Sequence, residues 1–297
     1  MLTTVVAWLA ITQRAFRAPE NLAQLGQEIG LLGVLACGES LVILTGGIDL
    51  SIAAMAALAA CAAGASMAAG VPWPAGALIG LAAGGAAGWL NGALVTYRRL
   101  APILVTLATL LLYRAATNVA TGAVPYNQLP EGFKALGRGG VPLGALVLVC
   151  AVSALMLARA RFGRHLVAVG GGEQSARLSG IRVDAVLRRV YMGAGLCAAA
   201  SGLLMAAAAN NAQWSVADGW ELDVIAAAVI GGVRLTGGEG SVVSAALGAA
   251  IIVVLRNALF LSGVPTERYG LVTGAVILVA ALAEQVRRAR ERRARHA

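Results

Sequence analysis

The sequence predicts an all-α fold, a polytopic transmembrane helical bundle with about ten membrane segments, the first of which is truncated. Composition supports this prediction: 59% of the 297 residues are hydrophobic, and the mean hydropathy is +0.80. Charged residues make up 12%, about half the share found in soluble domains. The apolar residues also gather in runs close to the roughly 20 residues that a spanning helix needs. Gly and Ala dominate these runs, which favours closely packed helices.

Ten apolar segments appear when the chain is cut at charges, prolines and turn residues. They cover residues 1–12, 22–45, 51–70, 74–97, 101–122, 141–159, 189–209, 221–235, 242–261 and 269–284. The first is short for a span and lacks the basic start of a signal peptide, so we expect a stunted helix or, preferably, a chain that begins downstream of its natural start. The segment 221–235 is doubtful as a full span. One transmembrane domain, residues 1–297, is expected.

The distribution of arginine predicts the orientation of the chain. The formal net charge is +9, and basic residues cluster at Arg98–Arg99, in the loop at about 160–188 and in the tail 285–297. The positive-inside rule puts these three regions, and with them the C-terminus, in the cytoplasm. An even number of predicted spans separates each pair, so the three assignments agree. Because the arginines lie between apolar runs, they favour a lipid bilayer as the partner over nucleic acid.

Two pairs of similar segments raise the question of an internal repeat. "GGIDLS" at 46–51 resembles "GGVRLT" at 231–236, and "LNGAL" at 90–94 resembles "RNALF" at 256–260. Transporters often contain repeated halves with interrupted helices in corresponding positions. The spacing within the two pairs differs, so both duplication and coincidence remain open.

Motifs for bond-making chemistry are missing from the sequence. No GxxxxGK[ST] phosphate loop occurs, and "VGGGE" at 169–173 does not follow a strand in a βαβ unit. The sequence also lacks HExxH and GxSxG, and its carboxylates are dispersed. The four cysteines lie inside apolar runs and are expected to be small buried residues. We therefore expect no enzyme, no metal site and no cofactor in this chain.

Polar residues inside the apolar runs are candidates for a translocation path. A charge in hydrocarbon costs at least about 2.5–3.5 kcal/mol, so such side chains normally face a cavity or a partner. The alternatives are a buried ion pair or a charge that reaches the interface from a helix end. For Glu221 and Asp223 we favour stabilisation of a helix N-terminus. The candidate path residues are Glu39, Asn91, Arg114, Asn118 and Asn257.

Glycine pairs predict two helix breaks, which the arginine-derived topology puts at an inner gate. Gly46 and Gly47 can interrupt a helix or let another backbone pass close by. Asp49 can then cap the next helix start by accepting backbone N–H groups. Residues of the two predicted breaks are Gly46, Gly47, Asp49, Ser51, Gly231, Gly232 and Arg234.

The long polar loop contains "EQSARLSGIRVDAVLRRV" at 173–190. Ala176, Arg177, Leu178 and Ile181 predict a short helix, which Gly180 would end. An exposed helix of this kind could dock a peripheral partner, although an ordinary solvated connector is the alternative.

The sequence resembles the membrane permease subunit of the bacterial ABC importers for ribose, xylose and related sugars, including rhamnose and autoinducer-2. The likeness lies in "LVILTGGIDLS", "APILVTLATLLLYRA", "VGGGEQSARLSGIRVDAV", "ELDVIAAAVIGGVRLTGGEGSV" and "LGAAIIVVLRNALFLSGV", which follow the family's order from residue 22 to 283. The chain departs from the family at Glu39, which is usually uncharged, and at Arg234, which is usually small or polar. Which sugar is carried stays open.

The resemblance implies a multi-pass subunit of the inner membrane that imports a monosaccharide or related small carbohydrate by alternating access. Its partners would be a second permease, identical or a sister chain, a cytoplasmic ATPase that binds the ATP, and a periplasmic or extracellular sugar-binding protein. The ATPase-coupling loop would comprise Glu173, Gln174, Ser175, Ala176, Arg177, Leu178, Ser179, Gly180 and Ile181. Of the family's EAA-and-Gly pattern, only Ala176 and Gly180 match in place. The alternative is a stand-alone secondary sugar transporter that uses Glu39 or Asp49.

Overall fold

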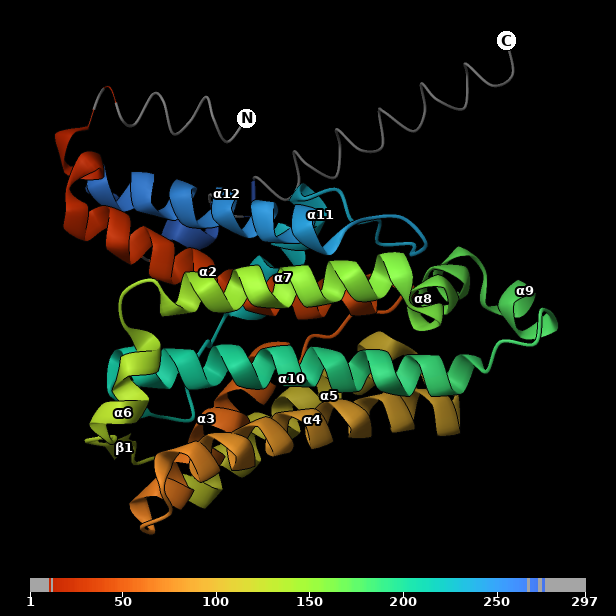
Figure 1. Cartoon of the computed structure of the whole chain (residues 1–297), viewed down its shortest axis with the longest axis horizontal. Coiled ribbons are helices and arrows are strands. Elements are labelled where there is room, and N and C mark those ends of the chain that lie inside the picture. Colours follow the sequence, from red (N-terminus) through yellow and green to blue (C-terminus); the bar gives the residue numbers. More distant parts are fainter. Residues whose placement is uncertain (1–10, 12, 266–267, 272–273, 276–297) are drawn as a thin grey trace.

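The computed structural model describes residues 11, 13–265, 268–271 and 274–275, and these form a helical bundle (Figure 1). The longer helices are α2 (Pro19–Leu44), α3 (Ile52–Ala68), α4 (Trp73–Arg98), α5 (Pro102–Thr121), α7 (Val141–Arg159), α10 (Val183–Ala209) and α12 (Val242–Leu261). Shorter helices are η1 (Arg14–Arg17), α6 (Glu131–Lys134), η2 (Ala135–Gly137), α8 (Arg161–Gly171), α9 (Glu173–Leu178) and α11 (Trp220–Ile230). Two short strands, β1 (Tyr126–Asn127) and β2 (Asn211–Ala212), pair antiparallel with Tyr126 opposite Ala212.

Six of the described helices are long and apolar enough to cross a membrane: α2, α4, α5, α7, α10 and α12. The all-α membrane fold is therefore confirmed, but the count of about ten segments is not. The predicted segment 51–70 forms the 17-residue α3, and 221–235 forms α11, whose 11 residues extend only about 16 Å. The predicted segments 1–12 and 269–284, like the tail 285–297, lie wholly or largely outside the described residues.

The helix predicted at 189–209 begins earlier, at Val183, and so shortens the polar loop expected at 160–188. Val183, Val186 and Val190 are all buried and recur at helical spacing, which continues the apolar face through the arginine-rich stretch. Asp184 lies in the first turn, where a negative charge favours a helix start. The remaining loop holds α8 and α9.

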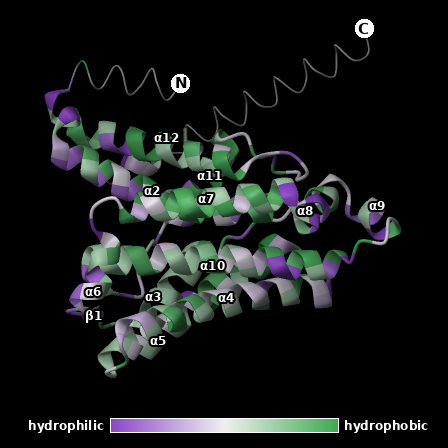
Figure 2. Ribbon diagram, in the orientation of Figure 1, coloured by the Kyte–Doolittle hydropathy of each residue, from purple (hydrophilic) through white to green (hydrophobic). Residues whose placement is uncertain are grey.

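Helix α2 lies at the centre of the bundle, and every residue from Gly30 to Leu44 is buried. The outer face of α7 is apolar (Figure 2), and Leu111 of α5 and Leu148 of α7 are among the exposed large side chains. Exposed apolar faces of this extent suit helices that contact lipid rather than water.

Small residues bring α4 and α10 into backbone contact. A Cβ added at Gly88 would lie 2.2 Å from the carbonyl oxygen of Tyr191, and one added at Gly195 would lie 2.2 Å from that of Gly84. Only glycine fits at either position, which bears out the close packing expected from the composition.

The bundle has two distinct ends (Figure 1). One, here called the α9 end, holds α8, α9, the C-terminal ends of α2 and α4, and the start of α10. The other, the hairpin end, holds β1, α6 and the start of α2. The first predicted helix break follows the C-terminal end of α2 and therefore lies at the α9 end.

Candidate functional site

The first break is the connection 45–51 between α2 and α3. Gly46 adopts φ +82°, a left-handed conformation that favours glycine. The N–H groups of Gly46 and Gly47 donate to the carbonyl oxygens of Ile43 (2.8 Å) and Val42 (3.2 Å), which ends the helix in a tight turn. The chain then enters α3 at Ile52, fully buried in the bundle.

Asp49 stabilises this connection through Ser51. Its Oδ1 accepts hydrogen bonds from the Ser51 N–H (2.9 Å) and from the Ser51 hydroxyl (2.6 Å). Ser51 is itself the N-cap residue of α3, and no side chain among the described residues caps the helix. Asp49 therefore closes the turn before the helix, one step earlier than the N-cap contact expected from the sequence.

Glu39, a candidate path residue, instead holds the same connection from within α2. Its Oε1 accepts the N–H of Asp49 at 3.0 Å, and both carboxyl groups are fully buried. The second oxygen of each, Glu39 Oε2 and Asp49 Oδ2, has no hydrogen-bond partner among the described residues. Glu39 thus connects the body of the helix to the break that follows it.

Asn91 and Tyr113 extend this buried network into α4 and α5. Asn91 donates to the Ser51 hydroxyl at 2.7 Å, and the Tyr113 hydroxyl donates to Asn91 Oδ1 at 3.0 Å or to the Ala87 carbonyl at 2.9 Å. The structure therefore brings together four residues singled out in the sequence: Glu39, Asp49, Ser51 and Asn91. Sequence reasoning missed Tyr113, whose signal was a hydroxyl within an apolar span beside Arg114.

The second break follows α11. Gly232 adopts φ +90°, and Arg234 donates its backbone N–H to the Glu239 carbonyl at 3.0 Å while its side chain forms an ion pair with Glu239. Gly237 and Gly238, also left-handed, complete the turn that precedes α12. This connection spans residues 231–241.

The two breaks meet each other and the end of α8. The Gly238 N–H donates to the Leu44 carbonyl oxygen at 2.9 Å. A Cβ added at Gly170 would lie 1.8 Å from that oxygen, and one added at Gly237 would lie 2.7 Å from the backbone nitrogen of Gly46. We call this set, Leu44, Gly46, Gly170, Gly237 and Gly238, the glycine junction. Any side chain at Gly170 or Gly237 would force the three segments apart.

The polar loop continues from this junction into α9. Ala176 is buried, whereas Leu178 is 84% exposed, and Gly180 follows with φ +81°. Arg177 forms ion pairs with Asp184, in the first turn of α10, and with Glu173 at 2.8 Å. These hydrogen bonds, that to Asp184 first, raise the pKa of the guanidinium above its ordinary value. They tie the exposed helix to the start of α10.

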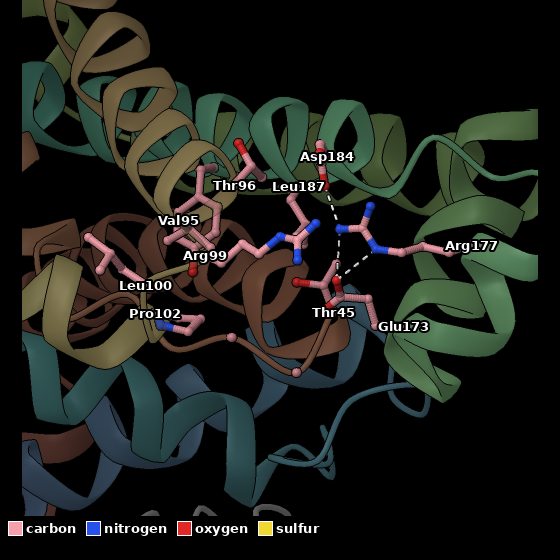
Figure 3. Close-up of a pocket in the computed structure, with 13 residues that line it drawn as sticks. Thr45, Val95, Thr96, Arg99, Leu100, Pro102, Glu173, Arg177, Asp184 and Leu187 are labelled. Carbon is pink, nitrogen blue, oxygen red and sulfur yellow. Dashed lines mark hydrogen bonds and ion pairs between the residues drawn. The ribbon is translucent and has the colours of Figure 1, made fainter.

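A cleft of about 290 Å³ lies between the first break and α9 (Figure 3). The side chains of Arg99 and Arg177 point toward one another across it, beside Glu173 and Asp184. Its lining residues from the first break are Thr45, Gly46 and Gly47, and α10 contributes Asp184, Leu187 and Tyr191. The cleft is therefore bounded by both the gate candidate and the loop.

The other candidate path residues lie apart from this site. Arg114 donates to the carbonyl oxygens of Trp214 and Val216, at 2.7 Å each, and so anchors the 210–219 loop at the hairpin end. Asn257 exchanges hydrogen bonds with Asn21, near the start of α2. The side chain of Asn118 makes no hydrogen bond within the described part of the chain. The buried network does not include these three residues.

Comparison with known proteins gives consistent results. Residues 21–281 match the family model described as the permease component of a branched-chain amino acid transport system. The ribose import permease protein RbsC of Bacillus subtilis is 37% identical over 291 residues, which cover 96% of this chain and 90% of that protein. RbsC of Escherichia coli is 34% identical, covering 95% and 91%, and the autoinducer 2 import system permease protein LsrC of Yersinia pseudotuberculosis is 33% identical, covering 93% and 80%. No solved structure matches the chain.

Proposed function

Because the chain belongs to this family of transport-system permease components, we propose that it is the membrane subunit of an ATP-driven ABC importer for a monosaccharide or related small carbohydrate. The relatives support the substrate class, since their names specify import of ribose and of autoinducer 2. The uptake experiment described below distinguishes ribose from autoinducer-2.

The glycine junction is the observation that carries the mechanism. In the proposed cycle, a cytoplasmic ATPase binds α9 and moves this helix when ATP binds to the ATPase. Gly170, at the end of α8, touches the carbonyl of Leu44 and lies beside Gly237 and Gly238, so displacement of the loop acts directly on both helix breaks. The breaks then open or close the passage, and hydrolysis resets them. A packed contact that has two alternative arrangements can amplify a small shift into a gate movement.

The exposed surface of α9 supports docking of a partner there. Leu178 is a large apolar side chain with 84% of its surface exposed, on a helix whose other accessible residues are polar. An apolar anchor with a polar rim suits a protein interface. ATP would be bound by that partner, because the sequence contains no phosphate loop of its own.

The arrangement of basic residues supports an orientation with the α9 end and the C-terminus in the cytoplasm. Arg98 and Arg99, at the end of α4, lie at the same end of the bundle as Arg177 and Arg182. The hairpin end would then face outward and receive sugar from a binding protein. A second permease, identical or a sister chain, would complete the membrane core.

ATP-driven uptake of labelled ribose and autoinducer-2 tests this proposal. The chain is reconstituted in liposomes with its cognate ATPase and binding protein, and uptake is measured with and without ATP inside. The proposal requires ATP and all components. Uptake that follows an ion gradient in liposomes holding this chain alone would instead establish the stand-alone secondary transporter, for which Glu39 or Asp49 would be the ion site.

A further inference from the structure

The N-terminal part of α2 carries polar side chains on a face that the gate does not use. Gln24, Gln27, Glu28 and Leu31 recur at intervals of three and four residues, so they share one side of the helix. Two cavities, of about 400 and 520 Å³, both include Gln24, Gln27 and Glu28 in their linings. Glu20 also lines the smaller cavity, and Arg256 and Asn257 also line the larger one. We call these two cavities together the α2 groove.

The α2 wall of the groove offers hydrogen-bonding groups that other described residues leave free. Gln24 donates to Glu28 at 3.0 Å, but Gln27 makes no hydrogen bond within the described part of the chain. Glu28 forms no ion pair with any described residue. Polar side chains on a spanning helix are costly unless they face water or a ligand, so this stripe must face one or the other.

The larger cavity is also lined by Arg256, Asn257 and Tyr269, which lie outside α2. Arg256 of α12 forms an ion pair with Asp223 through its terminal nitrogen, which leaves its Nε buried and without a partner among the described residues. The Tyr269 hydroxyl is likewise buried and has no hydrogen-bond partner among the described residues. Asn257 is held in place by its exchange with Asn21 at 2.7 and 3.3 Å. Arg256, Asn257 and Tyr269 thus line the same cavity as Gln24, Gln27 and Glu28.

Aromatic rings cover part of the same groove. Aromatic residues make up 5% of the chain, yet Trp220, Phe260 and Tyr269 are three of the twelve residues that line its larger cavity. The Cζ atom of Arg256 lies 6.0 Å from the centroid of the Trp220 ring. Apolar rings with a few convergent polar groups are typical of small-molecule sites. The unpaired Glu28 carboxylate disfavours an anion and leaves a neutral molecule rich in hydroxyl groups as the best match.

We propose that the α2 groove is a transient binding site for a neutral monosaccharide, located within one protomer at the outward end of the passage. This site rests on the proposed import function, which also supplies its outward orientation. Its wall includes Asn257, one of the path residues predicted from the sequence. Weak binding is what such a station requires, because a transported molecule must also leave it.

Gln27→Leu in the complete importer tests this site through transport. The change removes the free amide at similar size, and the maximal rate of sugar uptake is expected to fall about three- to tenfold, the range that follows from losing one hydrogen bond. The KM and the rate of ATP hydrolysis should stay constant, because the binding protein captures the sugar and the ATPase contacts lie at the other end. Gln213→Leu makes the same chemical change in the outward 210–219 loop, outside the groove, and should leave uptake intact.

Labelling of Gln27→Cys in the purified permease gives a readout independent of transport. A water-soluble thiol reagent should modify the introduced thiol above the background of the native chain, and millimolar D-ribose should slow the modification, whereas Gln213→Cys should show no protection. Normal uptake by Gln27→Leu, together with labelling of Gln27→Cys that ribose does not slow, would overturn the groove while leaving the importer intact. Protection without any ATP-driven uptake by the native complex would instead overturn the proposed import function alone.

Discussion

The backbone N–H of Gly238 donates a hydrogen bond to the carbonyl oxygen of Leu44 at 2.9 Å, and this contact joins the two helix breaks. Leu44 ends α2, whereas Gly238 precedes α12, so the bond links segments that are far apart in the sequence. Gly170 packs against the same carbonyl from the loop that carries α9. A single oxygen atom therefore lies where the loop and both breaks meet.

Two substitutions of Asp49 should distinguish the role of its hydrogen-bond acceptor from the role of its negative charge. Asn at position 49 retains an oxygen that can accept both hydrogen bonds from Ser51, so the thermal unfolding temperature in detergent should stay close to that of the native chain. Asp49→Leu removes the acceptor and leaves the Ser51 N–H and hydroxyl buried with fewer partners, at a cost of about 1–3 kcal/mol per unsatisfied group. Equal damage from Asn and Leu would point to a role that requires the negative charge.

Glu39 should behave as a support for the first break and not as an ion site. Glu39→Gln keeps the oxygen that accepts the Asp49 N–H, so the reconstituted complex should retain ATP-driven uptake. Glu39→Leu strands that N–H in the bundle interior and should lower both the unfolding temperature and the yield of folded protein. A stable Gln variant that has lost all uptake would contradict this role.

Leu178 should act as an anchor for the ATPase and contribute little to the fold. Because its side chain is 84% exposed, Leu178→Asp should leave the unfolding temperature of the isolated permease unchanged. Co-purification with the ATPase should fall at least tenfold. Val124→Asp, a similar change at an exposed position of the hairpin end, is the control and should keep the complex whole. If the Leu178→Asp variant still co-purifies with the ATPase, the proposal that α9 is the docking helix is wrong.

Local sequence patterns were sufficient for most of the helices. Apolar runs at 74–97, 101–122, 141–159 and 242–261 end within a few residues of α4, α5, α7 and α12. The start of α10 was harder to predict, because the arginines of 182–189 mask the buried valines on the opposite face of that helix. The high density of charge in this stretch favours a loop. The buried valines nevertheless recur every three to four residues, as they do in a helix.

The site itself could be predicted only in part. Single polar residues in apolar runs identified Glu39, Asp49 and Asn91, because burial of such groups always needs a reason. Their mutual contacts depend on how α2, α4 and α5 pack, which no local pattern encodes. The same limit applies to Asn257, a predicted path residue that hydrogen-bonds to Asn21. It applies also to Gly170, which matters because it contacts the distant Leu44.

The most direct test of the account compares Gly170→Ala with Gly171→Ala in the reconstituted importer. The two glycines are neighbours at the end of α8, but a Cβ at Gly170 would lie 1.8 Å from the Leu44 oxygen, whereas one at Gly171 meets no atom within 4 Å. The measurement is sugar uptake per ATP hydrolysed. We expect Gly171→Ala to match the native complex, and Gly170→Ala to bind the ATPase yet import at least tenfold less sugar per ATP. Native coupling in Gly170→Ala would contradict transmission through the glycine junction.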